Sequence, residues 1–131
     1  MSYTLRKKGL QRFPIEGAVL IYREPTTKEY IRYKDGISVG RHADGKLITE
    51  STEMEIELAN DILQDVEDFK FEKADGFEES LSKDTPISDL SHFEEAFGHP
   101  ITSWKDVIPP VWKTRLVLKV QGLLDEQTKN S

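Results

Sequence analysis

The chain has 131 residues, of which 32% are charged and 37% hydrophobic, and its formal net charge at pH 7 is −6. A chain of this length can bury one hydrophobic core, so we expect a single domain over 1–131. Its apolar stretches are too short to span a bilayer, and the absence of cysteine excludes disulfides and thiolate zinc sites. No apolar leader precedes the first charged residues, which favours a cytoplasmic location and no membrane partner.

Charge is distributed unevenly along the chain. Residues 1–49 carry a net charge of +5, residues 50–84 carry −10, and residues 85–131 carry −1. The first twelve residues form a basic arm, and the acidic middle disfavours nucleic-acid affinity for the molecule as a whole. We therefore expect a bipolar molecule, with a basic front and an acidic middle.

The segment 18–50 is typical of an antiparallel β-meander of three or four strands. Its runs of β-branched and aromatic residues lie at 18–22, 29–33, 37–39 and 46–49. Asp35-Gly36 and Asp44-Gly45 separate the last three runs, and Asp-Gly favours the tight turns of hairpins. The expected core side chains of these strands are Ile31, Tyr33, Ile37 and Val39.

The segment 52–70 is predicted to be an acidic amphipathic helix. Thr52 and Glu55 have capping-box spacing. Apolar residues then recur at helical intervals, at Ile56, Ala59, Ile62, Leu63, Val66 and Phe69. Alternation at Met54, Ile56 and Leu58 also allows the preceding strand to continue and the helix to begin later.

After a loop over 71–84, helical segments are expected over 85–125, followed by a frayed tail over 126–131. Thr85-Pro86 favours a helix start, and Gly98 is placed to end that helix. The expected core positions here are Phe93, Trp112, Leu116 and Val120. The predicted fold class is α+β, with the N-terminal meander packed against the acidic helix and two or three C-terminal helical segments.

Catalytic and metal chemistry find little support in the sequence. His92, Glu95 and His99 lie at i, i+3 and i+7, but Gly98 and Pro100 interrupt the helix that would align them. The glycines form no phosphate-binding loop, and no serine lies in a nucleophile elbow. We therefore expect no enzyme activity, no metal site and no cofactor.

The acidic helix provides the main functional hypothesis. Glu57, Asp61, Asp65 and Asp68 share one helical face, and such a row can match a basic protein surface. Size and charge resemble those of inhibitors, immunity proteins and phage-encoded anti-defence proteins, so a non-enzymatic partner-binding role is expected. A structural or assembly component of a phage or mobile element is the alternative. The acids could also serve only solubility.

A further alternative is binding of single-stranded nucleic acid. Arg6, Lys7 and Lys8 would hold phosphates, while Tyr30 and Arg32, on the predicted sheet, would contact the nucleic acid. Aromatic side chains beside cations on a sheet are how many single-strand binders work. The strongly acidic neighbouring segment argues against this function.

Overall fold

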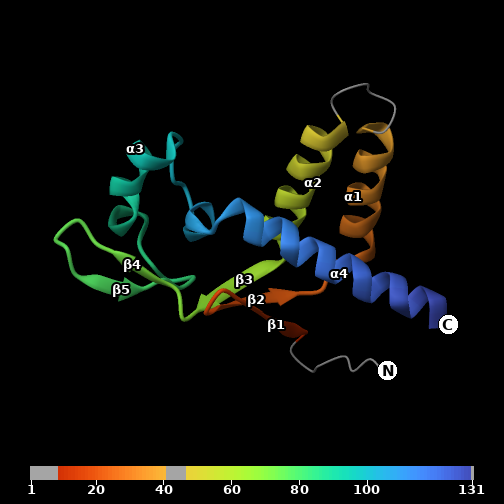
Figure 1. The fold of residues 1–131 in the computed structure, drawn as a ribbon, viewed down its shortest axis with the longest axis horizontal. Coiled ribbons are helices and arrows are strands. Elements are labelled where there is room, and N and C mark those ends of the chain that lie inside the picture. Colours follow the sequence, from red (N-terminus) through yellow and green to blue (C-terminus); the bar gives the residue numbers. More distant parts are fainter. Residues whose placement is uncertain (1–8, 41–46, 131) are drawn as a thin grey trace. The chain divides into compact units, whose positions relative to one another are not determined.

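The protein has an α+β fold with a three-stranded antiparallel sheet (Figure 1). The structure is a computed structural model that describes the backbone at residues 9–40 and 47–130. It divides into two compact units: the second contains Arg12–Tyr22 and Leu63–Pro109, and the first contains the remaining residues. None of the described helices combines the length and apolar character needed to cross a membrane.

The described part of the first unit is built from three helices. They are α1 (Thr27–Gly40), α2 (Leu47–Ile62) and α4 (Pro110–Asn130), and α2 packs against both of the others. The hydroxyl of Tyr33 donates to Gln121 Oε1 at 3.3 Å, and burial raises the pKa of Tyr33 to about 12. The buried apolar side chains of this unit include Tyr33, Leu58, Ala59, Ile62, Leu116, Val117 and Val120.

Helix α1 replaces most of the predicted β-meander. The expected strands at 29–33 and 37–39 and the expected turn at Asp35-Gly36 all lie within α1, and the described part of the last run falls in α2. The second turn, at Asp44-Gly45, lies outside the described residues. A glycine inside a helix costs about 1 kcal/mol, which the packing of α1 on α2 offsets.

The change from strands to a helix also changes which of the expected meander residues lie in the core. Ile31 is 53% exposed, so its assignment to the core was wrong, whereas Tyr33 is buried as expected. The side chains of Ile37 and Val39 lie outside the described residues. Successive side chains are about 100° apart around a helix, whereas they alternate by about 180° along a strand. Side chains that would share one face of a strand therefore point in different directions on a helix.

A capping box starts α1 where the sequence suggested a turn between strands. The Glu29 backbone N–H donates to Thr26 Oγ1 at 3.1 Å, and the Thr26 N–H donates to Glu29 Oε1 at 2.9 Å. These reciprocal bonds satisfy two backbone donors at the helix N-terminus. Thr52 and Glu55 have the same spacing but lie inside α2, which begins at Leu47. The predicted capping box therefore does not mark the start of α2.

Arg23 joins one end of α1 to one end of α2. Its guanidinium binds both carboxylate oxygens of Glu29, at 2.7 and 2.8 Å, and donates to the Asp61 carbonyl at 2.9 Å. The hydrogen bonds from Arg23 lower the pKa of Glu29 to about 2. One side chain therefore binds a carboxylate in the first turn of α1 and a carbonyl in the last turn of α2.

The three-stranded sheet lies mainly in the second unit and starts earlier than expected. Its strands are β1 (Leu10–Ile15), β2 (Ala18–Arg23) and β3 (Leu63–Glu67), in the order β1-β2-β3. Strand β1 begins inside the predicted basic arm, and Glu16 (φ 48°) and Gly17 (φ 90°) connect it to β2. Two successive residues with positive φ are typical of a type I′ hairpin turn. Of the strands expected in the meander, the one at 18–22 is confirmed, as β2.

Strand β3 replaces the second half of the predicted acidic helix. Helix α2 ends at Ile62, and the chain continues directly into β3, which pairs antiparallel with β2. The register shifts between Ile21 and Tyr22, because β3 has one extra residue there. Such a bulge interrupts the usual alternation, so Leu63 and Val66 are both buried although they are three residues apart. Their spacing therefore fits this bulged strand as well as it fits a helix.

Short elements complete the second unit. Strands β4 (Lys70–Glu72) and β5 (Glu78–Ser80) form a hairpin in the predicted loop. The 3-10 turns η1 (Ile87–Asp89) and η2 (Ser91–Phe93) lead into α3 (Glu94–Phe97), and η3 (Trp104–Val107) follows. Gly98 ends α3 with φ 76°, as its sequence position predicts. The unit's buried apolar residues are Ile15, Ala18, Leu20, Ile21, Tyr22, Leu63, Val66, Phe71, Leu81, Leu90, Ile101, Trp104, Val107 and Ile108.

Helix α4 confirms part of the C-terminal prediction. Leu116 and Val120 are buried, as their spacing indicates, whereas Trp112 is only partly buried, as is Phe93 in the second unit. The backbone of the expected tail at 126–130 continues α4, so that part of the prediction was wrong. A helix already nucleated and packed over several turns extends at little further cost.

Replacing Leu116 by alanine is expected to lower the free energy of unfolding by about 2–5 kcal/mol, because its side chain is completely buried. Leu118→Ala is the matched control on the same helix, where the leucine is 59% exposed. Its effect should stay within about 0.5 kcal/mol. Chemical denaturation measures both values, and equal losses would contradict the assigned faces of α4.

Glu29→Gln is expected to cost about 2 kcal/mol at neutral pH, since it removes the charge from the bonds with Arg23. A lowered folded-state pKa means that the carboxylate stabilises the fold above its ordinary pKa of 4.5 and loses this effect as pH falls toward about 2. The stability difference between the two proteins should therefore shrink across that interval. Glu53→Gln, at an exposed site in α2, is the control and should change the free energy of unfolding at neutral pH by less than about 0.5 kcal/mol.

Candidate functional site

The predicted row of four acids does not exist as one helical face. Glu57 and Asp61 lie on α2, but Asp65 lies in β3 and Asp68 follows that strand with φ 56°. The chain changes from helix to strand at Leu63, so the angular spacing of a helix no longer applies. The two pairs of acids also belong to different units.

Two of these acids bind a cation within the first unit. Arg32 Nη2 lies 3.1 Å from Glu57 Oε1 and 2.7 Å from Asp61 Oδ2. The side chains of Arg32 and Glu57 are more than half exposed, so each contact contributes less than about 1 kcal/mol. Arg32 nevertheless neutralises part of the negative charge that these acids could offer to a partner.

Asp65 has a structural role. Its Oδ1 accepts hydrogen bonds from the backbone N–H groups of Val66 and Lys83, at 2.8 and 2.9 Å. The second bond ties the segment after β5 to β3. A carboxylate that satisfies two backbone donors is committed to the fold and is a poor candidate for partner binding.

The candidate nucleic-acid residues do not lie on a sheet. Tyr30 and Arg32 are in α1, where Lys34 Nζ lies 5.5 Å from the centre of the Tyr30 ring. Arg6, Lys7 and Lys8 lie outside the described residues. A helix therefore replaces the flat aromatic platform on which the predicted single-strand binding would depend.

Negative charge is concentrated on the second unit. It has thirteen acidic and five basic side chains, a net charge of −8, whereas the rest of the chain carries +2. In the hairpin of β4 and β5, Glu72 lies directly opposite Glu78. Like charges at directly opposed positions weaken a sheet, so this arrangement is not explained by stability.

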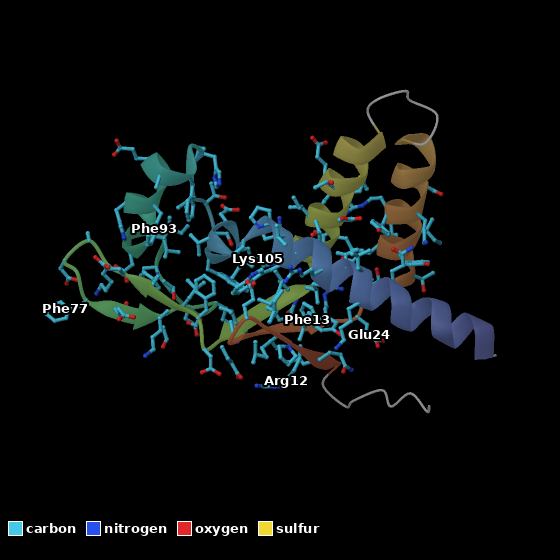
Figure 2. All side chains as sticks on the ribbon, in the orientation of Figure 1. Arg12, Phe13, Glu24, Phe77, Phe93 and Lys105 are labelled. Carbon is cyan, nitrogen blue, oxygen red and sulfur yellow. The ribbon has the colours of Figure 1, made fainter. Side chains whose placement is uncertain are left out.

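A row of rings lies on the same unit, and we call His92, Phe93, Phe97 and His99 the aromatic row. Ring centres are 4.1 Å apart for His92 and Phe93, 5.7 Å for Phe93 and Phe97, and 5.8 Å for Phe97 and His99. The buried ring of Phe71 meets Phe93 edge-on at 6.4 Å. Figure 2 shows Phe93 among the helical turns and Phe77 at the end of the neighbouring hairpin.

The two histidines are held by backbone carbonyls. His92 Nε2 lies 2.7 Å from the Glu72 carbonyl, and His99 Nδ1 lies 3.0 Å from the Pro100 carbonyl. Because a carbonyl oxygen only accepts, these ring nitrogens carry the hydrogens. Among the described residues, no three His, Asp or Glu side chains come together to hold a metal ion.

A shallow pocket of about 180 Å³, which we call the acidic pocket, lies beside the aromatic row. Lys73 Nζ lies 3.8 Å from Glu79 Oε2, so the cation at the pocket has a partner of its own. Asp75 Oδ1 accepts from the Phe77 N–H at 3.0 Å. The lining comes from the turn of the β4–β5 hairpin and from η1 and η2: Lys73, Ala74, Asp75, Ser88, Asp89 and His92.

Sequence patterns identify some residues of the aromatic row but do not predict that these residues form an exposed row. Phe93 is predicted as a core residue from helical spacing, yet it is only partly buried, and Phe97 is 43% exposed. Spacing of this kind suits a buried stripe and an exposed row equally well, so only exposure distinguishes the two roles. Comparison with known proteins adds no assignment: no family, no curated protein and no solved structure matches the chain.

Asp65→Ala is expected to lower the free energy of unfolding by about 2 kcal/mol, because two backbone N–H groups lose a charged acceptor. Glu57→Ala serves as the comparison within the same predicted row. It removes only an exposed ion pair and should change stability by less than about 0.5 kcal/mol. Urea denaturation of both variants tests the assignment, which fails if the two losses are equal.

Proposed function

We propose that the protein is a non-enzymatic binding protein whose partner is a macromolecule with a basic surface. The observation that carries this proposal is the concentration of negative charge on the second unit, including the opposed pair Glu72 and Glu78. Charge of one sign on one unit steers a partner of opposite sign and raises the association rate.

Some acids of the second unit are free to act in this way. Within the described part of the chain, Glu78 and Glu95 are exposed and take part in no ion pair. Asp65 and Glu94, by contrast, are used by the fold: Glu94 Oε1 accepts from the Ile101 N–H at 3.3 Å. The proposed binding charge therefore lies on the hairpin and on α3 rather than on α2.

An inhibitor, an immunity protein or an anti-defence protein of a phage would each use such a surface against a basic partner. All three kinds of protein fit the proposed function equally well. Nucleic acid is disfavoured as the partner, because phosphates would be repelled by a unit with a net charge of −8.

The double variant Glu78→Lys and Glu95→Lys separates binding from stability. A lysine at position 78 would face Glu72 across the hairpin and replace repulsion with attraction, so the fold should be unchanged or slightly stabilised. Capture of the partner by the immobilised chain, from nuclease-treated lysate of the native host, should nevertheless fall sharply. Raising the salt from about 0.15 M to about 1 M should release the partner, since the Debye length falls from about 8 Å to about 3 Å.

Glu53→Lys with Glu57→Lys is the matched control, with the same change in charge at exposed positions of α2. It should leave capture intact. Equal retention by both double variants, with unchanged salt dependence, would show that the acids only confer solubility. Loss of capture in the control alone would return the binding site to α2.

A further inference from the structure

The aromatic row forms a continuous, partly exposed surface that the fold holds in place. Phe93 stacks on Phe97 with the ring planes 15° apart, and the buried Phe71 supports Phe93 edge-on. Phe97 is 43% exposed, and both histidines are exposed. Single exposed apolar residues need no explanation, but stacked rings at the surface mark candidate interaction sites.

Backbone contacts fix the ends of this row. The Glu72 carbonyl accepts from His92, and the Pro100 carbonyl accepts from His99. Gly98, in the left-handed conformation, ends α3 directly after Phe97 and donates its N–H to the Glu94 carbonyl at 2.8 Å. Rings that are already ordered lose little conformational entropy on binding, which favours their use as anchors.

Carboxylates line the acidic pocket and are exposed on α3. Asp75 and Asp89 line the pocket together with His92, and Glu95 is exposed on α3, between Phe93 and Phe97 in the chain. The lysine that lines the pocket already lies near Glu79. An incoming cation would therefore meet net negative charge at the pocket, and aromatic faces next to it attract cations as well.

We propose that the aromatic row and the acidic pocket together dock a basic amphipathic segment of a protein partner. Apolar side chains of that segment lie on Phe93 and Phe97, and a flanking lysine or arginine enters the pocket. This inference rests on the proposed function and adds the partner's chemistry: apolar side chains as well as positive charge. A purely basic surface would leave the exposed rings in water.

A labelled synthetic helix of lysine and leucine is the probe, and its affinity for the full chain is measured by fluorescence anisotropy. A peptide of equal charge, with serine in place of leucine, is the control ligand. The lysine–leucine peptide should bind about tenfold more tightly. Phe97→Ala should remove most of that advantage and leave binding of the lysine–serine peptide unchanged.

Ile31→Ala is the matched control variant, because Ile31 is an exposed apolar residue on α1, in the first unit. It should bind both peptides as the parent does. Asp89→Lys should weaken binding of the lysine–leucine peptide through the loss of negative charge at the pocket. Circular dichroism spectra of the variants check that each is folded.

Three outcomes would overturn this inference. Equal affinity for the two peptides would show that charge alone binds, and the proposed function would survive without the aromatic row. An equal effect of Phe97→Ala and Ile31→Ala would exclude a specific surface. Finally, a parent chain that sediments as a dimer, and becomes a monomer on Phe97→Ala, would assign the row to a second copy of the chain.

Discussion

The guanidinium of Arg23 binds two helix ends that are far apart in the sequence. It holds the Glu29 carboxylate in the first turn of α1 and the Asp61 carbonyl in the last turn of α2. Carbonyl groups in the last turn of a helix lack partners within the helix, and they favour a nearby cation. Because Glu29 also belongs to the capping box with Thr26, this single arginine stabilises the start of α1 and its position beside α2.

The carboxylates of the second unit divide into two groups with different physical roles. Asp65, Glu94 and Asp106 accept hydrogen bonds from backbone N–H groups and thereby fix the path of the irregular segments. Glu78 and Glu95 are exposed and contribute no such bond within the described residues. The excess of negative charge is therefore partly structural, and the remaining part is the charge that a partner would meet.

The second unit also contains an arrangement that opposes stability, because Glu72 and Glu78 repel each other across the hairpin. Stable folds tolerate such arrangements where a binding surface requires them, and the aromatic row lies on the same unit. Under the proposed function, apolar rings and acids placed together would select a partner that is both apolar and basic, which is more specific than charge alone.

Local patterns in the sequence determined the elements whose signals have a single interpretation. Ala18–Arg23 is a strand because its run is short and rich in β-branched and aromatic residues, and Gly98 ends α3 because it readily adopts a positive φ. The positions of Leu116 and Val120 on the buried face of α4 also follow from helical spacing alone. The α+β class was predicted correctly, although several of the elements behind that prediction were not.

Tertiary structure decided the elements whose local signals were ambiguous. Residues 29–39 contain β-formers and Asp35-Gly36, yet they are helical, since Arg23 and the packing on α2 outweigh propensities of less than about 1 kcal/mol per residue. Leu63–Glu67 is a strand because β2 supplies its backbone partners. The aromatic row could not be predicted either. The fold brings Phe71 to Phe93, and Phe97 is exposed because the rest of the described chain does not pack over its ring.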